Sequence, residues 1–462
     1  MLEYSERTNA LVIGLGRSGL ASTAALRERG AAVVVVDEKS PDALRDAITA
    51  IEDRGARFVT PDELPALLPG ITLAILSPGV PPTSRVVRLV REAGIPAIGE
   101  IELAARLCAA PIIAITGTKG KSTTTALIAH LLRTCGVDAV AGGNIGEPLV
   151  AAVARATSRS WVVAELSSFQ LEGIATLRPR ISVLLNIAPD HLDRHASIEE
   201  YAEAKFRIVM NQSEGDTIVL DRDDPRLRAL EGRFESRGCA ARRLWYTLEH
   251  DGPAADMSLR GEQIVTTAAG GAAVAVADWS DVPLPGEHNL RNAMAALLAA
   301  IAAGCPPASL RAGLRTFVAL AHRLQPIAEI DGVLYVDDSK ATNPTATVAA
   351  LRAYDRPVVL VAGGREKGTD FAELGGVMRA RVRALVALGE AAGMLARVAD
   401  GLPVTFASSM EEAVEQARRA AVTGDVVLLS PACASFDMFA SAEDRGDRFA
   451  RAVRLIPRGA HA

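Results

Sequence analysis

A glycine-rich segment has the residue types and spacing of a phosphate-binding loop. Ile115-Thr-Gly-Thr-Lys-Gly-Lys-Ser122 follows an apolar, strand-like run and precedes a helix-like stretch at residues 123–134, although Ile115 stands where the common motif has its first glycine. In such a loop the backbone N–H groups point at phosphates, Lys121 reaches the β- and γ-phosphates, and the hydroxyl of Ser122 binds Mg²⁺. A turn without a ligand is the alternative, but the position between strand and helix favours ATP binding. The predicted ATP contacts are Gly117, Thr118, Lys119, Gly120, Lys121, Ser122 and Thr123.

A second glycine-rich turn lies near the start of the chain. Gly14-Leu-Gly-Arg-Ser-Gly19 follows the first apolar strand, and Asp37 ends the next one. This pattern places a diphosphate at a helix N-terminus and an acid near a ribose hydroxyl. It is compatible with a nicotinamide-dependent oxidoreductase, with a protein that binds UDP, and with a tight turn that binds nothing. The turn alone does not distinguish these three interpretations.

Three further side chains have types suited to metal or acid–base chemistry. Glu165 ends an apolar strand, where a solvated acid is unexpected and a cap or a salt bridge is the alternative. Together with Ser122, it predicts a Mg²⁺ site that phosphate and water oxygens complete. His191 and Lys205 follow along the chain. By themselves they are better explained as an ordinary histidine and a surface lysine on a helix.

An alternation of apolar strands and helical stretches has to position these residues. Continuous apolar runs separated by helices predict parallel sheets that are covered on both faces. Residues 216–281 have shorter segments punctuated by Gly, Asp and Pro, which predicts a small antiparallel sheet. The predicted strands cover residues 10–14, 32–37, 73–77, 111–116, 161–166, 181–187, 333–336, 358–361, 385–388 and 426–429.

The length of 462 residues suits three domains, and the fold class is predicted as α/β. Residues 1–104 form a Rossmann-like domain, and residues 105–320 form a central domain similar to P-loop ATPases that includes the small antiparallel sheet. Residues 321–462 form a second Rossmann-like domain.

Composition excludes several other classes of protein. The net charge of −5 argues against a nucleic-acid or membrane surface as a partner. The apolar stretch at residues 293–303 is too short to span a bilayer and is interpreted as a buried helix. No export signal is visible in the polar first ten residues, and the five cysteines have no paired spacing. We therefore expect a cytoplasmic protein with reduced thiols, and we expect a monomer.

Taken together, the motifs resemble those of the Mur ligase family over essentially the whole chain. The phosphate loop of that family reads Gly-Thr-x-Gly-Lys-Ser/Thr, as this chain does from Gly117 to Ser122. Within the family, Asp338-Ser-Lys-Ala-Thr-Asn343 and Ser430-Pro-Ala-Cys-Ala-Ser435 are similar to the members that add D-glutamate. The resemblance also includes residues 142–146, 165–171, 186–191, 287–292, 322–323, 363–367 and 429–437.

The resemblance implies an ATP-dependent ligase that forms a carbon–nitrogen bond. Such an enzyme adds D-glutamate to UDP-N-acetylmuramoyl-L-alanine through an acyl phosphate, releasing ADP and phosphate. The pathway implied is the synthesis of peptidoglycan precursors, and with it cell-wall biogenesis, cell shape and cell division. L-glutamate or another amino acid is the near alternative, because the sequence does not reveal the stereochemistry. A non-catalytic ATP-binding protein is the other alternative, and it leaves Lys205 unexplained.

The resemblance also implies roles for single residues. The catalytic residues would be Lys121, Glu165, His191 and Lys205. His191 would bind a second Mg²⁺, for which Mn²⁺ could substitute, and Lys205 would be carbamylated. A carbamate presents oxygens to a metal ion, which an ammonium cannot do. The implied nucleotide contacts are Asn289, Asn292, Arg323 and Asp338.

The two remaining substrates are assigned to different ends of the chain. The implied contacts to the UDP substrate are Gly16, Arg17, Ser18, Asp37, Ser77, Gly79, Asn144 and His191. Those to glutamate are Lys340, Thr342, Lys367, Ser435 and Phe436, of which Lys367 is the candidate cation for a carboxylate. The family usually has an aromatic residue seven positions after Ser435, where this chain has Ala442.

Overall fold

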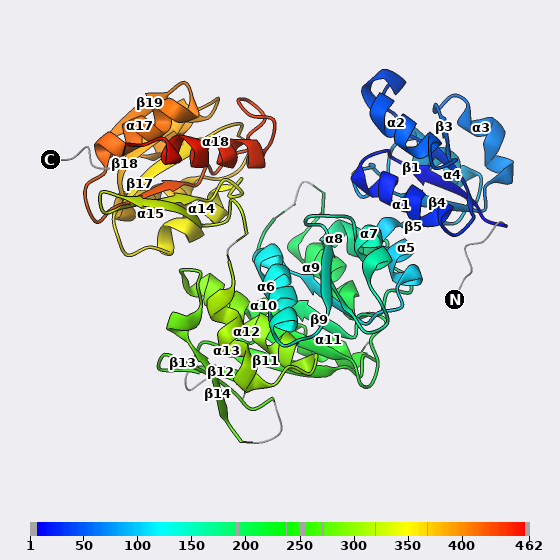
Figure 1. Cartoon of the computed structure of the whole chain (residues 1–462), viewed down its shortest axis with the longest axis horizontal. Coiled ribbons are helices and arrows are strands. Elements are labelled where there is room, and N and C mark those ends of the chain that lie inside the picture. The colour runs from blue at the N-terminus through cyan, green and yellow to red at the C-terminus, as the bar shows by residue number, and fades with distance from the viewer. Residues whose placement is uncertain are drawn as a thin grey trace. The chain divides into compact units, whose positions relative to one another are not determined.

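Two compact units make up the chain in the computed structural model (Figure 1). One comprises Met1–Asp281 and Arg291–Thr316, and the other comprises Val282–Leu290 and Phe317–Ala462. Three mainly parallel sheets with helices around them confirm the predicted α/β class. The domain boundaries at residues 104 and 320 stay a prediction. The structure describes residues 7–190, 194–236, 238–249, 255–268, 272–318, 320–366 and 368–457.

The first sheet is parallel throughout, with the order β3-β2-β1-β4-β5. Its apolar central strand β1 (Asn9–Ile13) pairs with β2 (Ala32–Val36) on one side and β4 (Leu73–Leu76) on the other. The carboxyl ends of these three strands therefore meet at one edge, where the strand order reverses and ligands commonly bind. The remaining elements are β3 (Arg57–Val59), β5 (Ala97–Gly99), α1 (Arg17–Arg27), α2 (Arg45–Glu52), α3 (Leu64–Leu67), α4 (Arg85–Glu92) and α5 (Glu100–Leu107).

The second sheet has nine strands in the order β14-β13-β12-β11-β10-β9-β6-β8-β7. Its parallel strands are β6 (Ile112–Thr116), β7 (Ala139–Gly143), β8 (Trp161–Glu165), β9 (Ile181–Leu184), β10 (Thr217–Asp221) and β11 (Arg242–Thr247). The predicted antiparallel part extends this sheet as β12 (Met257–Arg260), β13 (Gln263–Thr266) and β14 (Val274–Asp278). Strands β10 and β11 fall within the predicted antiparallel region, but they pair in parallel and belong to the main sheet.

Helices pack against the second sheet, whose strands β6 and β9 are buried along their whole length. The side chains at residues 293–300 are fully buried within α12 (Glu287–Ala302), as the predicted buried helix requires. Within the described ranges, no helix combines the length and apolarity needed to cross a membrane. The others are α6 (Lys121–Thr134), α7 (Leu149–Arg155), α8 (Ser168–Glu172), α9 (Ile198–Phe206), α10 (Pro225–Ala229), α11 (Glu231–Ser236) and α13 (Pro307–Thr316).

The third sheet has the order β15-β16-β20-β17-β18-β19 and lies in the second unit. In Figure 1, α14 (Pro344–Arg352) and α15 (Ala372–Arg381) cover one face, and α17 (Met410–Ala420) and α18 (Ala442–Arg454) cover the other. Strand β20 pairs in parallel with β16 on one side and with β17 on the other, so the loops that follow these three strands meet at one edge of the sheet. The remaining elements are β15 (Gln325–Ile330), β16 (Val333–Asp337), β17 (Val358–Gly363), β18 (Val382–Leu388), β19 (Val404–Ala407), β20 (Val426–Leu429) and α16 (Ala392–Val398).

Candidate functional site

The predicted phosphate loop leaves β6 at Thr116 and enters α6 at Lys121. Gly117 and Gly120 have φ values of +151° and +84°, which side-chain-bearing residues rarely adopt. A Cβ on Gly120 would lie 2.1 Å from Oδ1 of Asn292, so this glycine also lets α12 approach the loop. The amine of Lys121 donates to the carbonyls of Gly117, at 2.8 Å, and Thr118, at 3.0 Å. Asn292 and Lys121 therefore both lie at the loop, and their contacts with ATP stay a prediction.

Lys205 is buried against this loop. Its side chain is 1% exposed, so the surface-lysine alternative is wrong. Its Nζ donates to the carbonyl of Gly117 at 2.8 Å and lies 4.4 Å from the centre of the Tyr201 ring. Burial, and next the positive charge of Lys121, lower the pKa of Lys205 to about 6. The amine is therefore mainly neutral at pH 7.

Glu165 ends β8, in register with Ile115 of β6, and is 2% exposed. Its Oε1 accepts a hydrogen bond from Nδ2 of Asn144 at 2.8 Å. Its Oε2 is buried without a hydrogen-bond partner among the residues that the structure describes. A buried carboxylate oxygen without a donor is costly unless a cation satisfies it. Glu165 and the buried Ser122 hydroxyl offer the hard oxygen atoms that suit Mg²⁺.

Two further predicted residues belong to the surroundings of this site. Asn144, expected at the sugar-peptide end of the UDP substrate, hydrogen bonds to Glu165, and its contact with the substrate stays a prediction. His191, the expected ligand of a second metal ion, lies outside the described residues. In the part of the chain that is described, no cluster of three His, Cys, Asp or Glu side chains could hold a metal ion alone.

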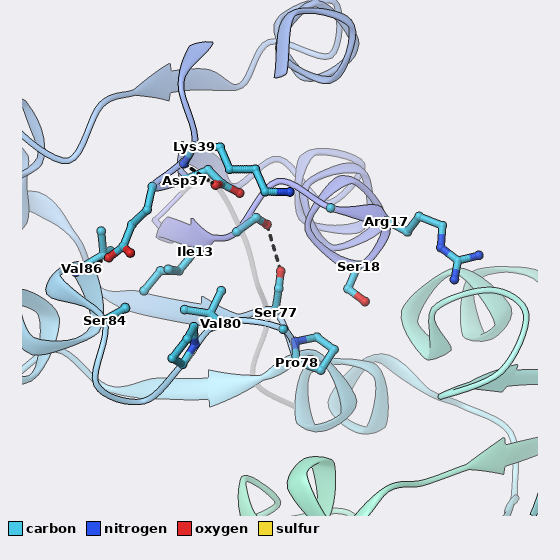
Figure 2. Close-up of a pocket in the computed structure, with 15 residues that line it drawn as sticks. Ile13, Arg17, Ser18, Asp37, Lys39, Ser77, Pro78, Val80, Ser84 and Val86 are labelled. Carbon is cyan, nitrogen blue, oxygen red and sulfur yellow. Dashed lines mark hydrogen bonds between the residues drawn. The ribbon is translucent and has the colours of Figure 1, made fainter. Parts of the chain in front are cut away.

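A cavity of about 440 Å³ opens at the carboxyl edge of the first sheet (Figure 2). Six of the predicted UDP-substrate residues line it: Gly16, Arg17, Ser18, Asp37, Ser77 and Gly79. Figure 2 shows that the guanidinium of Arg17 points away from Asp37 and Ser77. It donates to the carbonyl of Gly146 at 3.0 Å, so only the stem of this side chain is available to the cavity.

The glycine-rich turn beside this cavity is held from two neighbouring strands. Oδ2 of Asp37, after β2, accepts from the N–H of Leu15 at 2.7 Å. The hydroxyl of Ser77, after β4, donates to the carbonyl of Gly14 at 2.9 Å. A Cβ on Gly19 would lie 1.9 Å from that carbonyl oxygen, whereas one on Gly16 would have no described atom within 4 Å. Gly19 is thus required by packing, whereas Gly16, which lines the cavity, is not.

The predicted nucleotide and glutamate residues of the second unit gather around the loops after β16 and β20. Asp338 accepts from the hydroxyl of Ser430 at 3.0 Å and from the N–H of Leu324 at 3.2 Å. Burial raises the pKa of Asp338 to about 7. His322 and Leu324, on either side of Arg323, have φ values of +62° and +43°, so this segment is strained.

The glutamate residues differ in exposure. Lys340 forms an ion pair with Glu443 that lowers the pKa of Glu443 to about 2. Ser435 is buried, whereas Phe436 is 67% exposed. Thr342 is half-buried in the loop after Lys340. Lys367 lies outside the described residues. Ala442 begins α18, and its carbonyl accepts from the hydroxyl of Ser339 at 2.7 Å.

Sequence reasoning missed Arg445, which is 1% exposed beneath these loops. Its guanidinium donates to the Ser339 carbonyl at 2.8 Å, the Ser339 hydroxyl at 2.9 Å, and the carbonyls of Cys433 and Gly363 at 3.2 and 3.3 Å. One side chain thus connects the loops after β16, β17 and β20. An arginine inside the last helix carries no sequence signal that distinguishes it from its exposed neighbours.

Asn289, the remaining residue predicted to contact the nucleotide, is in α12, where its Nδ2 donates to the carbonyl of Pro285 at 2.8 Å.

A phosphate loop, a buried acid and a buried amine at one sheet edge are parts expected of an enzyme that transfers phosphoryl groups. Three family descriptions match this chain: Mur ligase MurD-like, N-terminal domain, at residues 8–99; Mur ligase middle domain, at residues 115–300; and Mur ligase, glutamate ligase domain, at residues 322–433. The chain belongs to the Mur ligase family, a family of enzymes that form carbon–nitrogen bonds.

Curated relatives match over nearly the whole length. The chain is 43% identical to a UDP-N-acetylmuramoylalanine–D-glutamate ligase of Pelotomaculum thermopropionicum, covering 99% of this chain and 100% of the relative. It is 42% identical to a ligase of the same name from Salinibacter ruber, covering 97% of this chain and 98% of that relative.

Solved structures share the fold. They include the UDP-N-acetylmuramate–alanine ligase of Thermotoga maritima, with a TM-score of 0.60 and 17% identity over 97% of this chain and 99% of that one. The MurF ligase of the same organism, in complex with ADP, has a TM-score of 0.59 and 18% identity over 92% and 95%.

Proposed function

We propose that this chain is an ATP-dependent ligase that joins D-glutamate to UDP-N-acetylmuramoyl-L-alanine during peptidoglycan precursor synthesis. The buried Lys205 amine, 2.8 Å from the carbonyl of Gly117 in the phosphate loop, is the structural observation that supports this proposal most strongly. A lysine amine is rarely buried in a protein interior unless it is paired or has a functional role. The full-length similarity to curated D-glutamate ligases supports the choice of substrates.

The chemistry follows from the reactivity of the acceptor carboxylate, which is too poor an electrophile to react with an amine directly. An oxygen of that carboxylate attacks the γ-phosphorus of ATP, and the bond to ADP breaks. The glutamate amine then attacks the carbonyl carbon of the acyl phosphate, loses a proton and displaces phosphate. Lys121 and the amides at the start of α6 hold the phosphates, and positioning supplies much of the rate because two anions must meet.

Mg²⁺, when bound, neutralises phosphate charge. Ser122 and Glu165 would hold it, since the unpartnered Oε2 of Glu165 fits a cation. Lys205 would support a second ion as a carbamate, together with His191. The pKa of about 6 for Lys205 favours this modification, because only a neutral amine reacts with CO₂. Mn²⁺ is proposed as a substitute for either ion.

The cavity at the first sheet is proposed to bind the UDP moiety through Gly16, Ser18, Asp37, Ser77 and Gly79. Asn289, Asn292, Arg323 and Asp338 are proposed to bind the nucleotide of ATP. Lys340, Thr342, Lys367, Ser435 and Phe436 are proposed to bind glutamate. We place the three functions in residues 1–104, 105–320 and 321–462, and we propose a cytoplasmic monomer.

Phosphate release tests this proposal directly. It should require ATP, Mg²⁺, UDP-N-acetylmuramoyl-L-alanine and D-glutamate together, with product identified by mass. L-glutamate should give much less product at the same concentration. Equal product from both enantiomers would contradict the specificity. NADH binding tighter than the UDP substrate would contradict the assignment of the first sheet.

A further inference from the structure

Asn186 joins the phosphate loop to the end of the neighbouring strand. It lies two residues beyond the end of β9, which pairs with β6. Its side-chain Oδ1 accepts from the N–H groups of Thr118, at 3.1 Å, and Lys119, at 2.9 Å. Its Nδ2 donates to the carbonyl of Lys119 at 3.1 Å. Three side-chain hydrogen bonds therefore fix three consecutive peptide groups of the loop, from Gly117–Thr118 to Lys119–Gly120.

The orientation of this amide follows from its partners. A backbone N–H only donates and a carbonyl only accepts, so exchanging Oδ1 and Nδ2 would leave all three contacts unsatisfied. The segment that carries Asn186 is itself fixed. The N–H of Ile187 donates to Oδ2 of Asp224 at 3.0 Å, and the N–H of Ala188 donates to the Thr118 hydroxyl at 3.0 Å.

These contacts change which loop amides can hold a phosphate. In a simple phosphate loop all successive N–H groups are candidates. Here the N–H groups of Thr118 and Lys119 are already directed at Asn186, with that of Thr118 also reaching the main-chain carbonyl of Asn186 at 3.0 Å. The phosphate is therefore expected further along, at the first turn of α6, where helix geometry and the macrodipole favour an anion.

We propose that Asn186 is a positioning residue for the terminal phosphates of ATP. It turns two loop amides away from the nucleotide and aligns the start of α6 with the β- and γ-phosphates. The inference rests on the proposed function, because it takes the loop as the ATP site. Asn186 acts through the loop and does not itself need to touch the nucleotide.

Calorimetric binding of ADP and AMP tests this role. Both nucleotides share the adenosine and the α-phosphate, so their affinity ratio reports the β-phosphate subsite. Asn186→Ala removes all three side-chain bonds, and Asn186→Gln keeps the amide but displaces it by one methylene. In both variants the preference for ADP over AMP should fall about tenfold or more, as expected from the loss of several hydrogen bonds. AMP binding and UDP-substrate binding should be unchanged.

Asn211→Ala is the matched control. Its Nδ2 also donates to two backbone carbonyls, those of Ala175 at 2.8 Å and Leu177 at 2.9 Å, but away from the loop. The Asn211→Ala variant should keep the wild-type ratio of ADP affinity to AMP affinity. If wild-type protein does not prefer ADP over AMP, the proposed ATP site is wrong. If wild-type protein prefers ADP and both Asn186 variants keep that preference, the role of Asn186 alone is wrong. Equal loss of ADP, AMP and UDP-substrate binding would indicate general misfolding and would also overturn the positioning role.

Discussion

The amine of Lys205 and the amine of Lys121 donate to the same acceptor, the carbonyl of Gly117, each at 2.8 Å. Two ammonium groups around one oxygen repel each other, and this repulsion adds to burial in lowering the pKa of Lys205. Converting the mainly neutral Lys205 amine to a carbamate would place a negative charge beside Lys121. The positive charge of Lys121, which disfavours an ammonium at Lys205, would attract that carbamate, which gives the modification an electrostatic reason in this site.

Lys205→Ala should therefore abolish ligation while the protein stays folded. We expect turnover to fall at least about a hundredfold, the scale seen when one electrostatic contributor to a transition state is removed. Added acetate or formate should restore part of the activity by supplying a carboxylate. The measurement is phosphate release with saturating substrates.

The modification itself can be observed in wild-type protein. Labelled bicarbonate should give a carbamate carbon signal that Lys205→Ala lacks, and Lys39→Ala, in the cavity of the first sheet, should keep that signal. Full activity of wild-type protein that shows no carbamate signal would contradict the proposed role. The same holds if Lys205→Ala ligates at the wild-type rate.

The two glycines Gly16 and Gly19 should respond differently to the same change. Gly16 lines the cavity, and a methyl group added to it would meet no described atom within 4 Å, so Gly16→Ala should change stability by less than about 0.5 kcal/mol. Affinity for the UDP substrate should fall at least about tenfold, because the backbone can no longer approach a diphosphate. Gly19→Ala drives a methyl group into the Gly14 carbonyl and should destabilise the fold by about 2 kcal/mol or more. Titration with UDP-N-acetylmuramoyl-L-alanine and thermal unfolding measure the two effects. Wild-type affinity in Gly16→Ala would exclude the turn as the diphosphate site.

The central strands and the loops after them could be predicted from sequence because their signals are local. Residues 426–429 form a strand with the predicted bounds, since all four are apolar and buried in the middle of the sheet. Edge strands were not predicted. β15 contains Gln325, Pro326 and Glu329 and is only partly buried, so its pairing with β16 and not its composition makes it a strand. The burial of Lys205 was likewise invisible to helix periodicity, and the family resemblance implied a role for this residue but not its burial.

Long-range contacts are the part of the structure that the sequence could not predict. The hydrogen bond between Asn144 and Glu165 joins residues that are 21 positions apart, and no local pattern indicates that pairing. β10 and β11 are short and flanked by turn residues, as antiparallel strands often are. Their parallel pairing depends on the helices α10 and α11 that connect them, which are also short. Sequence spacing does not encode which strand a segment will join.

His322 should make stability depend on pH. Its Nδ1 hydrogen bonds to Oδ2 of buried Asp337 at 2.7 Å, and Asp447 and Glu443 also face it. The bond to Asp337, and next the nearby acids, raise the pKa of His322 above 6.5 against the opposing effect of burial. A raised folded-state pKa contributes stability below the unfolded pKa and loses that contribution as pH rises through the folded value. His322→Asn, which tolerates the positive φ of this position, removes the titrating group.

The wild-type protein should therefore have the larger Tm advantage over His322→Asn at pH 6, and this advantage should shrink towards pH 9. Other titrating groups are common to both proteins and cancel in the difference. Thermal unfolding at several pH values measures it. An advantage that grows with pH would show that burial, and not Asp337, dominates the protonation of His322.

Arg445→Lys should separate glutamate binding from UDP-substrate binding. The planar guanidinium of Arg445 bonds to three loops at once, which a single ammonium cannot reproduce. Those loops carry the proposed glutamate residues, so the KM for glutamate should rise about tenfold or more, the effect of losing one charge-assisted hydrogen bond. The Kd for UDP-N-acetylmuramoyl-L-alanine should not change, because its proposed residues lie in the other unit. Arg448→Lys, on the same helix with an exposed pair to Asp444, is the matched control and should behave as wild type. A rise in KM that both variants share would indicate a general effect of losing a guanidinium from α18, and an unchanged KM in Arg445→Lys would show that the three loops hold their positions without the guanidinium.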